Sequence, residues 1–165
     1  MTQPHACTCA ESGGGQTITS FLSADHRHAD ALLGDAVQHA AKANWPQCAR
    51  QLAAFRGALE THMKLEEQVL FPAFERATGS DAGPTAVMRH EHRQMIQMLD
   101  EMTHAAASQA GERFDVLAPA FIRIIDTHSM KEENMLYPMC DRVLDATTSE
   151  TLRETLNELR RVERT

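Results

Sequence analysis

An eleven-residue motif occurs twice in this sequence, and it constrains the fold more than any other feature. The copies run from His62 to Pro72 and from His128 to Pro138, so that corresponding residues are 66 positions apart. Each copy reads His-x-x-x-Glu-Glu, then an amide residue, two apolar residues, an aromatic residue and a proline. Since residues four apart lie on the same face of a helix, the histidine and the first glutamate of each copy point the same way. Two imidazole–carboxylate pairs, on helices able to face each other, indicate a metal site.

The composition of the chain favours helices. Of the 165 residues, 42% are hydrophobic but only 5% are aromatic. Alanine, leucine and methionine supply most of the apolar bulk, and all three are strong helix formers. No run of alternating β-branched residues indicates a strand. Because a chain of this length fits one domain, we predict a single all-α domain over residues 17–165.

The first sixteen residues have a different composition. Residues 1–16 contain Cys7 and Cys9 close to His5, followed by a serine and three glycines. This composition is typical of a flexible tail. The Cys-x-Cys pair and the histidine are ligands for a soft metal, but three ligands do not close a four-ligand structural site. The other two cysteines fall inside predicted helices, so we expect no disulfide framework.

The charge of the chain limits its partners. The formal net charge is −7 and the sequence pI is about 5.7, whereas nucleic-acid binding needs a basic face. No basic and apolar segment indicates a secretory signal, and no apolar stretch is long enough to cross a bilayer. We therefore expect a cytoplasmic protein that binds neither nucleic acid nor membrane.

Four long amphipathic helices and one shorter helix are predicted from the apolar periodicity. Pro72 falls inside the second of them, where it would kink the helix or free the carbonyl of Gln68, and Pro138 repeats this feature in the fourth. The last helix, over about residues 149–163, either covers one end of the bundle or mediates a homodimer. The five helices start near residue 19, after Asn44, after Pro84, between residues 112 and 115, and near residue 149.

Each long helix carries one histidine in its apolar stripe, at a position that a plain bundle would fill with leucine. His28 and His90, in contrast, share their faces with polar residues and should be solvated. Two of the stripes add a glutamate one turn after the histidine. The resulting set of six candidate metal ligands is His26, His62, Glu66, His92, His128 and Glu132.

These six groups would destabilise a core unless a cation neutralised them. Buried carboxylates are costly unless they are paired or bound to metal, and buried imidazoles need partners. Four imidazoles and two carboxylates suit a pair of divalent ions, and the mixture favours Fe, Mn or Zn over Ca or Mg. The alternative is four histidines at the core edge, each paired with a nearby acid. Glu133, five residues after His128, would replace Glu132 if the helix were distorted.

At these residues the chain resembles the hemerythrin-like (HHE cation-binding) family, whose members are four-helix bundles with a non-haem di-iron centre. The resemblance covers roughly residues 18–144 and implies an up-down-up-down four-helix bundle with a short additional C-terminal helix. The matching pieces are Asp25-His26, His62-x-x-x-Glu66 with Leu70-Phe71-Pro72, Glu91-His92, and His128-x-x-x-Glu132 with Leu136-Tyr137-Pro138.

The resemblance also implies a ligand arrangement. Glu66 and Glu132 would bridge two iron ions that also share an oxo or hydroxo bridge. One iron would be completed by His26 with His62, and the other by His92 with His128. Zinc or manganese would fit the same ligands.

The chain departs from the oxygen-carrying members of the family. Their third helix supplies two histidines four apart, whereas here His92 is followed four residues later by Ile96. The set of four histidines and two glutamates is more similar to relatives that sense or store iron, respond to oxygen or nitric oxide, or repair iron–sulfur centres. The repair proteins also carry an N-terminal domain with a Cys-Cys motif, for which residues 1–16 are too short.

Three functions follow as hypotheses. The first is a di-iron protein that binds or senses O₂ or NO, or handles iron. The second is a di-iron redox enzyme that reduces peroxide or NO, or repairs an iron centre. The third is an interaction module that responds to iron or redox state through its last helix.

Overall fold

The computed structural model describes residues 17–162, which form helices joined by short turns and contain no strand, and this confirms the all-α prediction. The predicted tail with Cys7 and Cys9 lies outside the described residues, as do residues 163–165. The helices are α1 (Ile18–Ala41), α2 (Trp45–Leu65), η1 (Glu66–Leu70), α3 (Phe71–Thr78), α4 (Pro84–Ala107), α5 (Gly111–Lys131), η2 (Glu132–Leu136), α6 (Tyr137–Val143) and α7 (Ala146–Val162).

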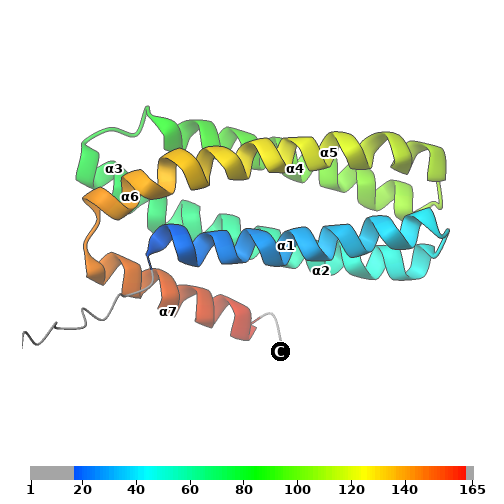
Figure 1. Cartoon of the computed structure of the whole chain (residues 1–165), viewed down its shortest axis with the longest axis horizontal. Helices are drawn as coiled ribbons and strands as arrows, with labels where there is room; N and C mark the ends of the chain where they lie inside the picture. Colours follow the sequence, from blue (N-terminus) through cyan, green and yellow to red (C-terminus); the bar gives the residue numbers. More distant parts are fainter. Residues whose placement is uncertain (1–16, 163–165) are drawn as a thin grey trace, which may run out of the picture.

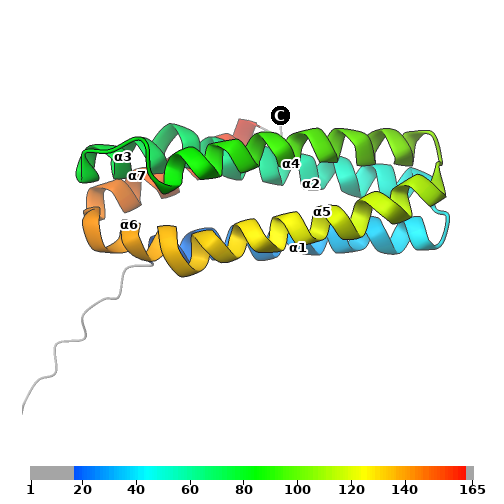
Figure 2. The same ribbon diagram turned by 90° about the horizontal axis from the view of Figure 1, so that it is seen from above.

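Two long helical hairpins form the body of the molecule. Helices α1 and α2 lie side by side, as do α4 and α5, and the turns of both hairpins lie at the same end (Figures 1 and 2). The hairpins contact each other through α2 with α4 and through α1 with α5. At the opposite end, α3 and α6 extend α2 and α5 beyond the π-helical turns η1 and η2. The result is a helical bundle.

The two hairpins repeat each other along the sequence. Helices α1 and α4 each have 24 residues, and α2 and α5 each have 21. Each element of the second hairpin starts 66 positions after its counterpart, as Pro84 follows Ile18 and Gly111 follows Trp45. The repeated motif is therefore the end of a repeat that spans a whole hairpin.

A wider helical turn follows each motif histidine. The N–H of Phe71 donates to the carbonyl of Glu66, five residues earlier, and Tyr137 donates in the same way to Glu132. A proline comes next in each copy, and its ring would clash with the carbonyl four residues earlier in a regular α-helix. The additional residue in the turn relieves this clash, so we attribute both π-helical turns to these prolines.

The bundle has two apolar clusters with the metal-ligand candidates between them. The larger cluster fills the hairpin end, where the rings of Phe55 and Phe121 meet edge to face with centroids 5.8 Å apart. The smaller cluster lies beyond the π-helical turns and contains Phe71, Tyr137 and Leu152. Polar groups between two packed clusters are held away from water on both sides.

Two predicted helix starts were wrong. Helix α5 begins at Gly111, so Pro119 lies in its third turn rather than near its first. The earlier start lets Phe114 bury against the ring of Trp45, with centroids 5.9 Å apart. Helix α7 begins at Ala146 rather than near residue 149, because the carboxylate of Asp145 accepts a hydrogen bond from the N–H of Thr148 at 2.9 Å.

Helix α7 folds back along α2 and η1 (Figure 1). Leu152 is fully buried in the smaller cluster. The helix therefore packs on the side of the bundle, near the end that carries the π-helical turns, which is close to one of the two roles expected for it. A homodimer through its outer face stays a prediction. Within residues 17–162, no helix has the length and hydropathy needed to cross a membrane.

Asp141 of α6 ties the start of α1 to the end of the second hairpin. Its carboxylate accepts hydrogen bonds from the N–H groups of Ile18 at 2.7 Å and Thr19 at 3.3 Å. Removing such a cap costs about 1 kcal/mol. We expect Asp141→Ala to lower the free energy of unfolding by that amount in urea denaturation, whereas Asp81→Ala in the exposed loop before α4 should leave it unchanged. Equal effects of the two substitutions would contradict the capping role.

Candidate metal centre

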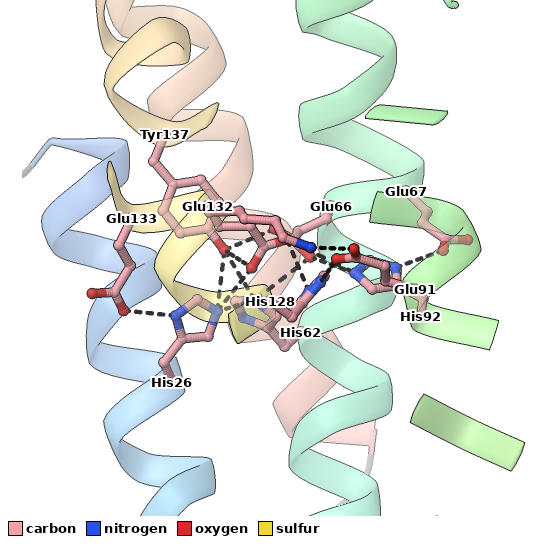
Figure 3. A network of polar contacts seen from close by, with 11 residues as sticks. His26, His62, Glu66, Glu67, Glu91, His92, His128, Glu132, Glu133 and Tyr137 are labelled. Atoms are coloured by element: carbon pink, nitrogen blue, oxygen red, sulfur yellow. Dashed lines mark hydrogen bonds and ion pairs between the residues drawn. The ribbon is translucent and has the colours of Figure 1, made fainter. Parts of the chain in front are cut away.

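The bundle brings all six predicted ligands together. Each of the four long helices contributes one histidine, and the glutamates open the two π-helical turns (Figure 3). The histidines are 2–8% exposed and both glutamates are fully buried. His28 and His90 are exposed, as their polar faces predicted. The buried set is His26, His62, Glu66, His92, His128 and Glu132.

Glu132 lies between two pairs of histidines. Within residues 17–162, two groups of side chains have ligand atoms within 4.8 Å of one another, and Glu132 belongs to both: one also has His26 and His62, the other His92 and His128. Its Oε2 lies 3.2 Å from Nε2 of His26, and its Oε1 lies 3.1 Å from Nε2 of His128. The two oxygens of one carboxylate thus face different histidine pairs.

Glu66 has a similar position. Its Oε2 lies 3.3 Å from Nε2 of His92 and 3.6 Å from Nε2 of His62, so it also contacts both pairs. Its Oε1 accepts a hydrogen bond from the hydroxyl of Tyr137 at 2.8 Å. The histidine pairing and the central place of both glutamates agree with the arrangement that the family resemblance implied.

A second layer of carboxylates orients the histidine rings. The Nδ1 of His26 lies 2.7 Å from Glu133, and the Nδ1 of His92 lies 2.8 Å from Glu67. A Nδ1–H that donates to a carboxylate leaves the lone pair of Nε2 on the inner side, which is the tautomer that binds metal. Glu133 therefore supports His26 from outside and does not replace Glu132, although the helix is distorted there as that alternative required.

The repeat contains a further pair of outer carboxylates, whose role the sequence interpretation missed. Glu91 lies 3.0 Å from Nδ1 of His128 and also pairs with Lys131. The corresponding residue, Asp25, lies 3.6 Å from Nδ1 of His62, beyond hydrogen-bond distance. The separation of 66 positions relates Asp25 to Glu91, so the repeat itself carried a signal for both.

The inner atoms of the centre fit a cation. Within the described part of the chain, the buried side-chain nitrogen and oxygen atoms without a hydrogen-bond partner all belong to the six residues: His62 Nδ1, Glu66 Oε2, His92 Nε2 and Glu132 Oε1. The Nε2 atoms of His26 and His62 are also only 3.0 Å apart. Two nitrogen lone pairs at this distance repel each other unless a proton or a metal ion lies between them. Unpaired buried polar atoms are costly. A metal ion would satisfy the three that face inward, Glu66 Oε2, His92 Nε2 and Glu132 Oε1, whereas His62 Nδ1 faces Asp25 on the outer side.

Tyr137 also contacts the centre, although it was not singled out from the sequence. It is fully buried and its hydroxyl points into the centre (Figure 3). Besides Glu66, the hydroxyl contacts Oε2 of Glu132 at 3.1 Å and the Nε2 atoms of His26 and His62, each at 3.2 Å. The sequence showed an aromatic residue at this position in both motif copies. It did not show that the hydroxyl group of Tyr137 would point into the site.

Proton binding to the histidines is strengthened in the metal-free protein. Burial acts to lower the pKa of His26, but hydrogen bonds and charge attraction to Glu132, with a further bond to Glu133, raise this pKa from 6.5 to about 9. For His92, burial is outweighed by Glu132, Glu66 and Glu67, which raise the pKa to about 10. Protons therefore occupy these imidazoles at neutral pH and must leave when a metal binds.

The pKa values of two acidic groups in the centre, Glu132 and Tyr137, are shifted as well. Burial acts to raise the pKa of Glu132, but hydrogen bonds from His128, His26 and His92 hold it well below its usual value. Burial and the negative charges of Glu132 and Glu66 raise the pKa of Tyr137 well above its usual value. In the metal-free protein Glu132 is thus ionised and Tyr137 is protonated.

These shifts predict how the stability of the metal-free protein depends on pH. The raised pKa values of His26 and His92 contribute stability that is complete below pH 6.5, the usual histidine pKa, and lost as the pH rises through about 9 to 10. Glu132 contributes in the opposite sense, since its stabilisation is present above its usual pKa of 4.5 and lost as the pH falls. The free energy of unfolding in the presence of a chelator should be greatest between these limits and decline toward pH 10.

Urea denaturation across this pH range measures the effect. His90→Ala, at an exposed position, is the matched control and should keep the alkaline decline. A free energy of unfolding that stays constant or increases from pH 6.5 to 10 would contradict the assigned ion pairs.

Comparisons with known proteins agree with this centre. The chain matches the family described as "Hemerythrin HHE cation binding domain" over residues 17–140. It is 42% identical to the iron-sulfur cluster repair protein YtfE of Edwardsiella ictaluri over 64 residues, which are 38% of this chain and 29% of that protein. It is 31% identical to the YtfE proteins of Salmonella paratyphi B and Salmonella newport over 110 residues, 61% of this chain and 50% of each relative.

The chain thus spans half or less of the length of these curated relatives. No solved structure matches it significantly. The family match extends over three quarters of the chain and includes all six buried ligand candidates. The protein belongs to the hemerythrin HHE cation-binding domain family.

Proposed function

We propose that this protein holds two non-haem iron ions in an up-down-up-down four-helix bundle formed by α1, α2, α4 and α5. His26 and His62 would bind one ion, His92 and His128 the other, and Glu66 and Glu132 would bind both. The observation that carries this proposal is the position of Glu132, whose two oxygens face different histidine pairs. Family membership supports iron as the metal, and the same donors would accept zinc or manganese.

The size of the adjoining cavity supports a diatomic ligand. A cavity of about 20 Å³ reaches His26, His62 and His128, and apolar side chains such as Phe55 and Leu59 form much of its wall. Roughly 10–15 Å³ of such space is enough for one water molecule. The cavity therefore suits O₂ or NO better than an organic substrate. A bound iron pair would supply open coordination positions for such a ligand and the ability to change oxidation state.

The protein side chains would fix the ligands and exclude water. Glu133, Glu67 and Glu91 hold the Nδ1 atoms of three histidines, which keeps their Nε2 lone pairs turned inward. The two apolar clusters close both ends of the centre. The two buried carboxylates would also offset part of the positive charge of the two cations, because each of them would face both ions.

A second candidate function is the repair of iron centres in other proteins. The YtfE relatives are named as iron-sulfur cluster repair proteins, which favours this function. It would use the same residues to accept or release iron. Transfer of iron from the loaded protein to a partner would support repair. Retention of iron with reversible binding of O₂ or NO would support the leading proposal. The cytoplasmic location expected from the sequence stays a prediction.

Metal content and spectra test the leading proposal. We expect aerobically purified protein to contain about two iron ions per chain, one for each histidine pair. It should show the charge-transfer absorption of a bridged ferric pair, and anaerobic reduction should bleach it. A protein without near-stoichiometric iron, or with iron but no such absorption, would contradict the proposal.

Helix α4 provides a matched pair of substitutions. His92 is 2% exposed and contacts Glu66, whereas His90 is exposed two residues away. We expect His92→Ala to remove about half of the bound metal, because one ion would lose one of its two histidines. His90→Ala should keep full metal content by elemental analysis. Equal losses in both variants would overturn the assigned ligand set.

A further inference from the structure

The two halves of the centre differ at one aromatic position. The separation of 66 positions relates Phe71 to Tyr137, and both rings are fully buried. The Phe71 ring stacks on His92 with centroids 5.9 Å apart, and the Tyr137 ring stacks on His26 with centroids 5.7 Å apart. Since the two rings occupy equivalent places, the halves differ here by the hydroxyl group of Tyr137.

The contacts of this hydroxyl are more numerous than hydrogen bonding explains. It lies 2.8 Å from Glu66 Oε1, 3.1 Å from Glu132 Oε2, and 3.2 Å from the Nε2 atoms of His26 and His62. A phenol oxygen can accept from the N–H groups of both imidazoles, but it has one hydrogen to donate, and the two carboxylate oxygens compete for it. Metal–ligand bonds are about 2.0–2.2 Å long, so neighbouring ligands at right angles are roughly 3 Å apart. All four distances are close to that separation.

The unpartnered atoms show the same asymmetry. Glu66 Oε1 and Glu132 Oε2, which face Tyr137, have hydrogen-bond partners. Glu66 Oε2, Glu132 Oε1 and His92 Nε2 have none. The fourth unpartnered atom, His62 Nδ1, lies on the outer side of its ring, 3.6 Å from Asp25. The shortest contacts of the other three are with the pair of His92 and His128, although Glu66 Oε2 also lies 3.6 Å from Nε2 of His62. At that pair, Phe71 brings a ring without a polar atom. The half that contains Tyr137 thus has one more oxygen atom able to bind a metal ion than the half that contains Phe71.

Building on the proposed di-iron centre, we infer that Tyr137 is a seventh protein ligand, which binds the ferric ion held by His26 and His62. The two metal positions are then chemically unlike: one has a phenolate oxygen and the other, beside Phe71, does not. As the oxygen–metal bond forms, the hydroxyl O–H bond breaks and its proton passes to bulk water, with no transfer of electrons. Tyrosine oxygen is an established ligand for ferric iron in proteins.

The composition of the chain makes the test direct. Tyr137 is the only tyrosine of the 165 residues, so any tyrosinate signal from the protein must come from it. The experiment compares wild-type protein and Tyr137→Phe, both loaded with iron, oxidised and assayed for metal content. Resonance Raman spectra and the visible phenolate-to-iron charge-transfer band provide the readout, which does not depend on activity.

We expect wild-type protein with about two ferric ions per chain to show the phenolate band and the ring vibrations of a coordinated tyrosinate. Tyr137→Phe should keep the iron and lose both signals. Full iron content without a phenolate signal in the wild type would overturn the inference while leaving the di-iron proposal intact. A signal that persists in Tyr137→Phe would overturn it too. Failure of the wild type to bind two iron ions would overturn both proposals. If the variant does not fold, the wild-type spectrum alone decides.

Discussion

The structure depends on the cost of burying ionisable groups. Two fully buried carboxylates and four nearly buried imidazoles lie between two apolar clusters, where water cannot solvate them. The free-energy cost of burying isolated charges there would be too high, so the groups must neutralise one another or bind cations. In the metal-free protein the groups neutralise one another, as the raised pKa values of His26 and His92 and the lowered pKa of Glu132 show. Metal binding replaces those protons with ions of higher charge.

The repeated hairpin explains how this set of groups is assembled. One hairpin supplies two histidines, one inner glutamate and the acids beside them, which is half of a centre. The outer carboxylates connect the halves, because Glu133 of the second hairpin holds His26 of the first and Glu67 of the first holds His92 of the second. The centre thus links the two hairpins through hydrogen bonds as well as through shared glutamates, so that its formation and the packing of the bundle are coupled.

The departure from symmetry is as informative as the symmetry. Phe71 and Tyr137 fill equivalent space and stack on equivalent histidines, yet one of them brings an oxygen atom into contact with four inner donors. With two ions bound as proposed, this one oxygen atom would give the two halves of the duplicated scaffold different metal environments. The relatives named as iron-sulfur cluster repair proteins match only part of this chain and about half or less of their own length, so the centre is the main basis for a function.

The sequence alone determined the helical class, the inward histidines and the six buried ligand candidates, because helical periodicity is local and each candidate occupies a position in an apolar stripe. His26 and His92 could be distinguished from His28 and His90 for that reason. Periodicity could not predict the π-helical turns or the start of α5, which depend on proline geometry and on the packing of Phe114 against Trp45. Nor could it assign Asp25, Glu91 and Tyr137 to the centre. Their roles depend on distances between helices, and only the tertiary structure decides which side chains from distant segments meet.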